Sequence, residues 1–187
     1  MSRRLLFCTL LAGVLLALPS AAAQDATVVI LVRHAEKVTP DPPDHDPALT
    51  AEGQARAQAL VGALADAGVD AIVTSQWRRT RQTAAPLAAH LGLTPAVLST
   101  DGAKDYPAAV AEAIRARYSG QTVVVVGHSN TVPQTVAALG GPSGLTICDA
   151  HYDDLFVVTL GRGGRAAGLV RARYGAPSPR AGPGCAP

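Results

Sequence analysis

Two unbroken runs of apolar, β-branched residues constrain the fold of this chain more than any other feature. TVVILV covers Thr27 to Val32, and TVVVV covers Thr122 to Val126. Runs this short and this continuous are typical of strands buried on both faces, as in a parallel sheet that helices cover on either side. Both runs therefore predict central strands of an α/β fold.

Segments with helical periodicity alternate with strand-like runs along the rest of the chain. Four helices are expected, with Thr50 as the cap of the first: 50–67, 78–91, 107–118 and 131–139. Four further strands are expected, the last two forming a hairpin: 70–74, 96–98, 155–160 and 166–173. This alternation predicts a three-layer α/β/α sandwich, with a mostly parallel central sheet and helices on both faces.

The first residues have the pattern of a cleavable signal peptide, predicted over residues 1–23. Arg3 and Arg4 precede the apolar run LLFCTLLAGVLLALP, and small residues follow before Gln24. The alternative, an uncleaved anchor, needs a longer apolar run than this one. We therefore expect a periplasmic or secreted protein with no stable membrane anchor after cleavage, one domain over 24–175, and a loose tail over 176–187.

Charge and cysteine content limit the classes of function. The 16 Lys and Arg include Arg3 and Arg4, so the predicted mature chain has as many cations as its 14 Asp and Glu. This balance argues against nucleic-acid binding, which needs a basic face. Cys148 and Cys185 would remain in the mature chain, either as a disulfide or as two thiols, and no CxxC spacing indicates a zinc or redox site.

Three polar segments follow predicted strands. Arg33 and His34 follow the first run, Arg78, Arg79 and Arg81 follow 70–74, and His128, Ser129 and Asn130 follow the run that ends at Val126. In open α/β sheets, ligands bind beyond the carboxyl ends of the strands. Several cations and few acids at that edge would suit a phosphoryl dianion, and a neutral histidine among them could attack phosphorus without a metal ion or other cofactor.

The motifs VRHAEK, LTAEGQARAQAL, TSQWRRTRQTA and VVVVGHSNTVP, in this order, resemble those of the histidine phosphatase superfamily, whose fold is that of phosphoglycerate mutase. The resemblance covers Val28 to about Arg173. It implies that His34 is the nucleophile, that Arg33 and Arg79 bind the phosphoryl group, and that His128 stabilises the transition state. Arg78 and Arg81 would then be neighbours at the rim.

The chain departs from the family pattern in three places, one of which is that the mutase-type glutamate signature between the second strand and the GHS segment is not recognisable. Ala35 stands where the family usually has glycine, and its methyl group should be tolerated if φ is negative. No acid follows His128, so the proton donor is open: Asp105, Asp101 and Glu36 are the candidates, with Asp105 slightly favoured. The cluster of His151 with Asp149, Asp153 and Asp154 could suggest a metal, but a polar loop before a strand is the preferred interpretation.

The sequence thus predicts a metal-independent phosphomonoester hydrolase for a small phosphorylated substrate. Two alternatives stay open: a non-catalytic phosphate-binding envelope module of the same fold, and a phosphotransferase similar to phosphoglycerate mutase. Neither the substrate nor the oligomeric state can be read from the sequence. The loop Val38–Pro47 and the segment Ser99–Pro107 are expected to shape the entrance of the site.

Overall fold

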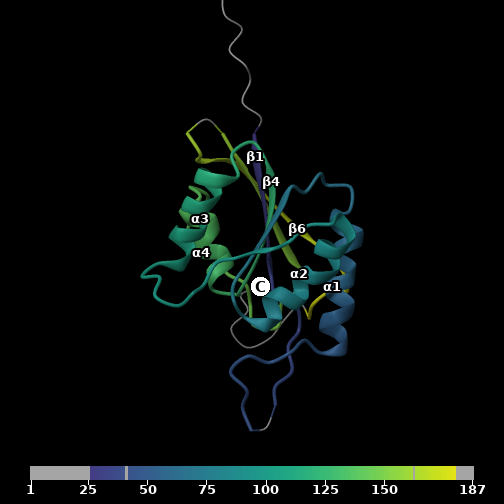
Figure 1. The fold of residues 1–187 in the computed structure, drawn as a ribbon. Coiled ribbons are helices and arrows are strands. Elements are labelled where there is room, and N and C mark those ends of the chain that lie inside the picture. Colours follow the sequence, from purple (N-terminus) through teal and green to yellow (C-terminus); the bar gives the residue numbers. More distant parts are fainter. Residues whose placement is uncertain (1–25, 41, 162, 180–187) are drawn as a thin grey trace, which may run out of the picture.

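A six-stranded sheet between two pairs of helices forms the fold (Figure 1). The computed structural model describes residues 26–40, 42–161 and 163–179. The strands are β1 (Thr27–Arg33), β2 (Ala71–Thr74), β3 (Ala96–Val97), β4 (Thr122–Gly127), β5 (Asp154–Leu160) and β6 (Ala166–Arg173). The helices are α1 (Ala51–Leu64), α2 (Arg78–Leu91), α3 (Tyr106–Arg117) and α4 (Thr131–Ala138).

The sheet is mostly parallel, as the sequence predicted. Its order is β3-β2-β4-β1-β5-β6, and the first four of these strands pair in parallel. β5 runs antiparallel to β1, and β6 runs antiparallel to β5, as the predicted hairpin requires. The carboxyl ends of β1, β2 and β4 therefore meet at one edge of the sheet, together with the amino end of β5.

The central strand β1 is buried on both faces, which explains its unbroken apolar run. Val29 and Leu31 belong to one core cluster with residues of α3 and α4, whereas Ile30 and Val32 belong to the other with residues of α1 and α2. Successive side chains of a strand point to opposite faces, so both faces need apolar residues. The predicted three-layer sandwich is confirmed.

Most predicted element boundaries agree with the structure to within a few residues. The first helix is shorter than expected, ending at Leu64 instead of Ala67, and Gly68 has a φ of 64° in the turn toward β2. Thr50 caps this helix as predicted, since its hydroxyl accepts a hydrogen bond from Gly53 N at 3.1 Å. The predicted signal peptide lies outside the described residues, so export stays a prediction.

The segment predicted as a loose tail is partly ordered by hydrogen bonds. The carbonyl oxygen of Ala176 accepts from Arg56 Nη1 at 2.9 Å, and Ser178 and Pro179 bond to the residues that precede β5. Backbone and side-chain partners from elsewhere in the fold thus hold 176–179, the first residues of the segment expected to be loose. Residues 180–187 lie outside the described part of the chain.

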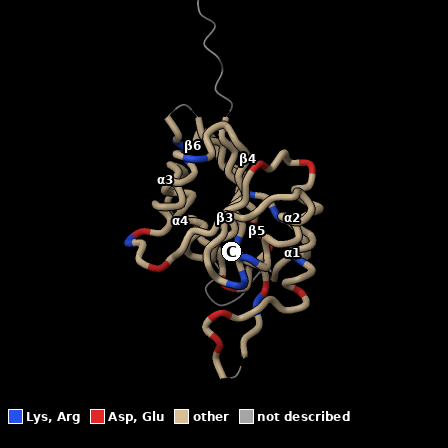
Figure 2. Tube along the Cα trace, in the orientation of Figure 1, with Lys and Arg blue, Asp and Glu red and all other residues tan. Residues whose placement is uncertain are grey.

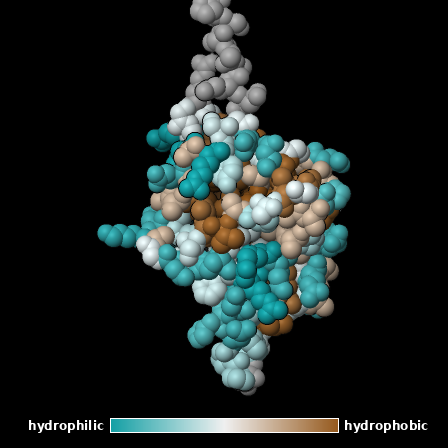
Figure 3. All heavy atoms as spheres, in the orientation of Figure 1, coloured by the Kyte–Doolittle hydropathy of each residue, from teal (hydrophilic) through white to brown (hydrophobic). Residues whose placement is uncertain are grey.

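Charged residues of both signs are distributed around the described chain (Figure 2). On the face seen in Figure 3, hydrophilic residues gather on the lower half, toward the loop that follows β1. Within the described residues, no helix combines the length and the apolar character needed to cross a membrane.

Gly53 in α1 packs directly against the backbone of Glu36. A Cβ at this position would overlap the carbonyl oxygen of Glu36, which itself accepts a hydrogen bond from Thr50 N at 2.9 Å. Gly62 lies in the same helix, and a Cβ there would meet nothing within 4 Å. The two glycines thus differ in packing but not in secondary structure.

We predict that Gly53→Ala lowers the free energy of unfolding by about 1–3 kcal/mol, the usual cost of overpacking. Gly62→Ala should raise it by up to about 1 kcal/mol, because alanine has the higher helix propensity. Urea unfolding of both variants measures the difference. Equal effects of the two substitutions would contradict the packing role of Gly53.

Candidate active site

The pairing of β1 with β4 brings the two predicted site histidines together. Arg33, the last residue of β1, pairs with Gly127, the last residue of β4. His34 N then donates to Gly127 O at 2.9 Å, so His34 and His128 leave the sheet side by side. Their ring centroids lie 5.4 Å apart, with the rings at 64° to each other.

His34 is held as a neutral imidazole with a defined tautomer. His34 is 4% exposed, and its Nδ1 lies 2.8 Å from the carbonyl oxygen of Ala35. A carbonyl only accepts, so Nδ1 carries the proton and Nε2 has the lone pair. Burial lowers the pKa of His34 to about 3, an effect that the Ala35 carbonyl opposes and that nearby His128 and the cations Arg33 and Arg79 reinforce.

His128 is oriented by a chain of hydroxyl groups. Thr80 Oγ1 donates to the backbone oxygens of Ser75 and Trp77, so it accepts the hydrogen of Ser75 Oγ at 2.9 Å. Ser75 Oγ then accepts from His128 Nε2 at 3.0 Å, which places a proton on that nitrogen. Burial, followed by the charges of Arg79 and Arg33, lowers the pKa of His128 to about 4.

Two arginines face this pair of histidines. Arg33 is 5% exposed, and its Nη1 donates to three carbonyl oxygens of the loop before β5, those of Cys148, Asp149 and His151, at 2.8–3.1 Å. Arg79 packs its guanidinium 5.0 Å from the centroid of the Trp77 ring. The Nε atoms of both arginines are buried and have no hydrogen-bond partner within the described residues.

These four side chains line one cavity of about 450 Å³. The structure thus brings together the predicted nucleophile and the three residues predicted to bind the phosphoryl group. The lining residues are Arg33, His34, Lys37, Arg79, His128, Ser129, Asn130, Asp149 and Tyr152. Arg78 and Arg81 are exposed on α2 and are not among them, as expected for neighbours of the site.

Ala35 fits its position in spite of the departure from the family pattern. Its methyl group is fully buried in a small cluster with Leu49 and Ala57, and its N–H donates to Thr83 Oγ1 at 2.9 Å. No non-glycine residue in the described ranges has a positive φ, so alanine causes no backbone strain here. The expectation that this methyl group is tolerated is confirmed.

None of the three acids suggested as proton donor lines the cavity. Glu36 forms an ion pair with Arg56, with a shortest distance of 2.7 Å, and Asp105 caps α3 by accepting from Ala108 N at 3.1 Å. Asp101 lies exposed in a turn. Their positions contradict the expectation, because long-range pairing and capping direct two of these carboxylates elsewhere.

The acidic residue that does line the cavity is Asp149, and Tyr152 follows on the same loop. Sequence reasoning did not assign either residue to the site. The available signal was the hairpin: a strand antiparallel to β1 starts at the edge where β1 ends. The residues just before β5 therefore had to lie beside Arg33 and His34.

This loop has a further covalent restraint. Cys148 is disulfide-bonded, and its partner lies outside the described residues, so pairing with Cys185 stays a prediction. Among the described residues, no group of three or more His, Cys, Asp or Glu side chains is arranged to hold a metal ion.

Comparisons with known proteins agree with this fold. The profile of the histidine phosphatase superfamily (branch 1) matches residues 29–101, which include His34, Arg33 and Arg79. A solved structure from Nakamurella multipartitia, described as a candidate phosphohistidine phosphatase SixA, is 27% identical with a TM-score of 0.55, over 83% of this chain and 98% of its own. The protein histidine phosphatase SixA solved with tungstate is 19% identical with a TM-score of 0.60, over 79% and 95%.

A curated relative is similar over a shorter range. The PE-PGRS family protein PE_PGRS11 of Mycobacterium tuberculosis is 58% identical over 53 residues, which are 28% of this chain but 9% of that protein. The fold is of the phosphoglycerate-mutase-like class. The profile of the histidine phosphatase superfamily, branch 1, matches 29–101 only, so the similarity to that family is limited to this part of the chain.

We predict that neither His34 nor His128 is protonated in the folded protein at pH 5. The unfolded chain has histidine pKa values near about 6.5, so it binds more protons than the folded chain below that pH. Stability from these two residues is therefore complete above about pH 6.5 and declines as the pH falls toward the folded values of about 4 and about 3.

Histidine Cε1–H resonances followed by NMR would test this, with His34→Asn and His128→Asn for assignment. A midpoint near pH 6.5 for either ring would contradict the prediction. Urea unfolding at pH 7 and pH 5 provides the thermodynamic check, since the two Asn variants should each lose less stability on acidification than the wild type.

Proposed function

We propose that the protein hydrolyses phosphate monoesters through a phosphohistidine at His34, without a requirement for a metal ion. One observation carries the proposal: a neutral histidine with its Nδ1 proton bound to Ala35 O lines a cavity with two arginines and a second histidine. The buried Nε–H groups of both arginines lack partners among the described residues. An anion with several oxygens would supply acceptors for such donors.

The reaction would proceed in two displacements. The Nε2 lone pair of His34 attacks phosphorus, the P–N bond forms, and the ester P–O bond breaks with its electrons on the leaving oxygen. Arg33 and Arg79 stabilise the charge on the three remaining phosphoryl oxygens, and His128 does so by donating its Nε2 hydrogen to one of them in place of Ser75 Oγ. Water then attacks phosphorus, the P–N bond breaks, and its electrons return to Nε2 as phosphate and a proton are released.

Asp149 is the side chain that we propose as proton donor to the leaving oxygen. Asp149 is the acidic residue among those that line the cavity, and Lys37 lines the same cavity with the opposite charge. After donating its proton, the carboxylate could accept one from the attacking water. An acid matters most for a leaving group that is itself a poor acid.

Replacement of the nucleophile tests the main proposal. His34→Ala should lower kcat for an aryl phosphate by at least about 10³-fold, because no other group in the mechanism forms the covalent intermediate. The wild type, mixed briefly with substrate and denatured in alkali, should carry acid-labile phosphate on His34. Mass spectrometry of the digested protein locates it.

The matched control is His90→Ala, an exposed histidine in the last turn of α2, which should leave kcat unchanged. Wild-type activity should also persist in excess EDTA. If the wild type and His34→Ala both hydrolyse the aryl phosphate only at the background rate, the hydrolase proposal is wrong and the non-catalytic phosphate-binding alternative is favoured.

The role of Asp149 predicts a dependence on the leaving group. Asp149→Asn should slow hydrolysis of an alkyl phosphate by about 10²-fold or more, while an aryl phosphate with a good leaving group changes by less than about threefold. Asp101→Asn, an exposed acid outside the cavity lining, serves as the control. Equal losses for both substrates would show that Asp149 does not donate the proton.

A further inference from the structure

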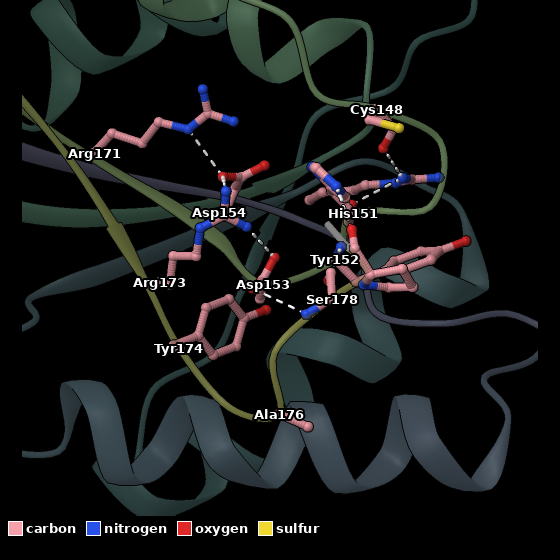
Figure 4. A network of polar contacts seen from close by, with 12 residues as sticks. Cys148, His151, Tyr152, Asp153, Asp154, Arg171, Arg173, Tyr174, Ala176 and Ser178 are labelled. Carbon is pink, nitrogen blue, oxygen red and sulfur yellow. Dashed lines mark hydrogen bonds and ion pairs between the residues drawn. The ribbon is translucent and has the colours of Figure 1, made fainter. Parts of the chain in front are cut away.

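The C-terminal segment 174–179 lies against the loop that carries Asp149 and Tyr152, here called the Arg33 loop (residues 148–152). Tyr152 N donates to Ser178 Oγ at 2.9 Å, and His151 Nε2 donates to Pro179 O at 2.7 Å. Figure 4 shows Ser178 between Tyr152 and Asp153, with Ala176 further along the same segment. The segment thus contacts two consecutive residues of the loop.

Asp153 links this segment to the sheet. Its side chain is 2% exposed, and each carboxylate oxygen has a partner: Arg173 Nη1 donates to one at 2.7 Å and Ser178 N to the other at 3.0 Å (Figure 4). Its backbone oxygen accepts from Tyr174 N at 3.0 Å. Burial alone would raise the pKa of Asp153, but the Ser178 hydrogen bonds and the charge of Arg173 outweigh it and keep the pKa below its usual value.

The Arg33 loop in turn sets the position of Arg33. Three of its carbonyl oxygens accept from Arg33 Nη1, and the Arg33 guanidinium lies 4.1 Å from the centroid of the Tyr152 ring. Tyr152 also contacts the nucleophile, with its ring centroid 6.2 Å from that of His34. A shift of this loop would therefore move the guanidinium and the aromatic wall of the cavity together.

We propose that Ser178, Asp153 and His151 are positioning residues for the phosphate site. The segment 174–179 holds the Arg33 loop in one conformation, and that conformation fixes Arg33 for the anion. None of the three belongs to the motifs of the family resemblance. The inference rests on the proposed function only in taking the bound anion to be a phosphoryl group.

A purely structural contribution makes a different prediction from a positioning role. If these bonds only stabilise the fold, their loss should lower the unfolding midpoint and leave the anion affinity of the folded protein unchanged. If they position Arg33, the loss should weaken binding of inorganic phosphate or tungstate while the protein stays folded. Anion binding can also be measured without catalytic turnover.

The experiment compares Ser178→Ala with Ser99→Ala in the full chain. Ser99 Oγ likewise accepts from a backbone amide, that of Asp101 at 3.0 Å, but it lies in an exposed loop outside the cavity lining. Calorimetric titration with tungstate should show a Kd raised about five- to 20-fold for Ser178→Ala and within about twofold of wild type for Ser99→Ala. Ser178→Thr keeps the hydroxyl and suits the extended backbone before Pro179, so it should restore the affinity.

His151→Ala provides a second variant that removes one side-chain bond to the segment, and its tungstate Kd should rise about threefold. With an aryl phosphate, KM for Ser178→Ala should rise and kcat should fall. Both should change because Arg33 contacts the phosphoryl group in the bound substrate and in the transition state. A wild-type tungstate Kd for Ser178→Ala would overturn the proposal, whatever its unfolding midpoint. A wild type that binds tungstate without hydrolysing esters would instead overturn the proposed function alone.

Discussion

The register between β1 and β4 is the constraint on which the candidate site depends. Arg33 stands opposite Gly127, and the next hydrogen bond, from His34 N to Gly127 O, extends the ladder past the end of both strands. A slip by one residue would exchange the two buried faces of β1 and move its side chains into core clusters that they do not fit. The close packing of the core therefore opposes such a slip. A Cβ on Gly127 would come within 3.0 Å of side-chain atoms of Thr131 and Val132. Glycine therefore fits this position, because α4 begins close to the end of β4. The interactions that stabilise the sheet thereby place the two histidines in contact.

Within the described residues, neither Arg33 nor Arg79 forms an ion pair with a carboxylate, so the site concentrates positive charge. The contrast with Arg56 is informative, because both Arg56 and Arg33 are 5% exposed. Arg56 is paired with the carboxylate of Glu36 as well as two carbonyl oxygens, whereas Arg33 has carbonyl oxygens and the face of Tyr152. The carbonyl oxygens accept from Nη1 of Arg33 and leave its net charge in place, while its buried Nε has no partner within the described residues. That arrangement suits a bound dianion, and it also helps to keep both histidines neutral.

The sequence was sufficient to predict the sheet, the helices and the four side chains at its edge, because hydrophobic runs and motif order report on them directly. It was insufficient for the proton donor. Glu36 and Asp105 stand at plausible places in the chain, but their partners, Arg56 and the first turn of α3, are evident only in three dimensions. Asp149 lies in the non-periodic stretch between α4 and β5, where nothing in the local sequence indicates which side chains reach the cavity. The ordered part of the C-terminal segment was missed for the same reason.

The antiparallel hairpin β5–β6 places the segment that follows β6 close to the site. β6 returns to the edge where β5 begins, and the pairing of Asp154 with Arg173 sets Asp153 beside Tyr174. This arrangement buries two carboxylates close to a site that should bind an anion. Each is paired with an arginine of β6, Asp153 with Arg173 and Asp154 with Arg171. Pairing cancels charges that would otherwise repel a phosphoryl group. The hairpin thus restrains the Arg33 loop through Asp153, and its arginines neutralise the charges of Asp153 and Asp154. It does so although it lies outside residues 29–101, where the family profile matches.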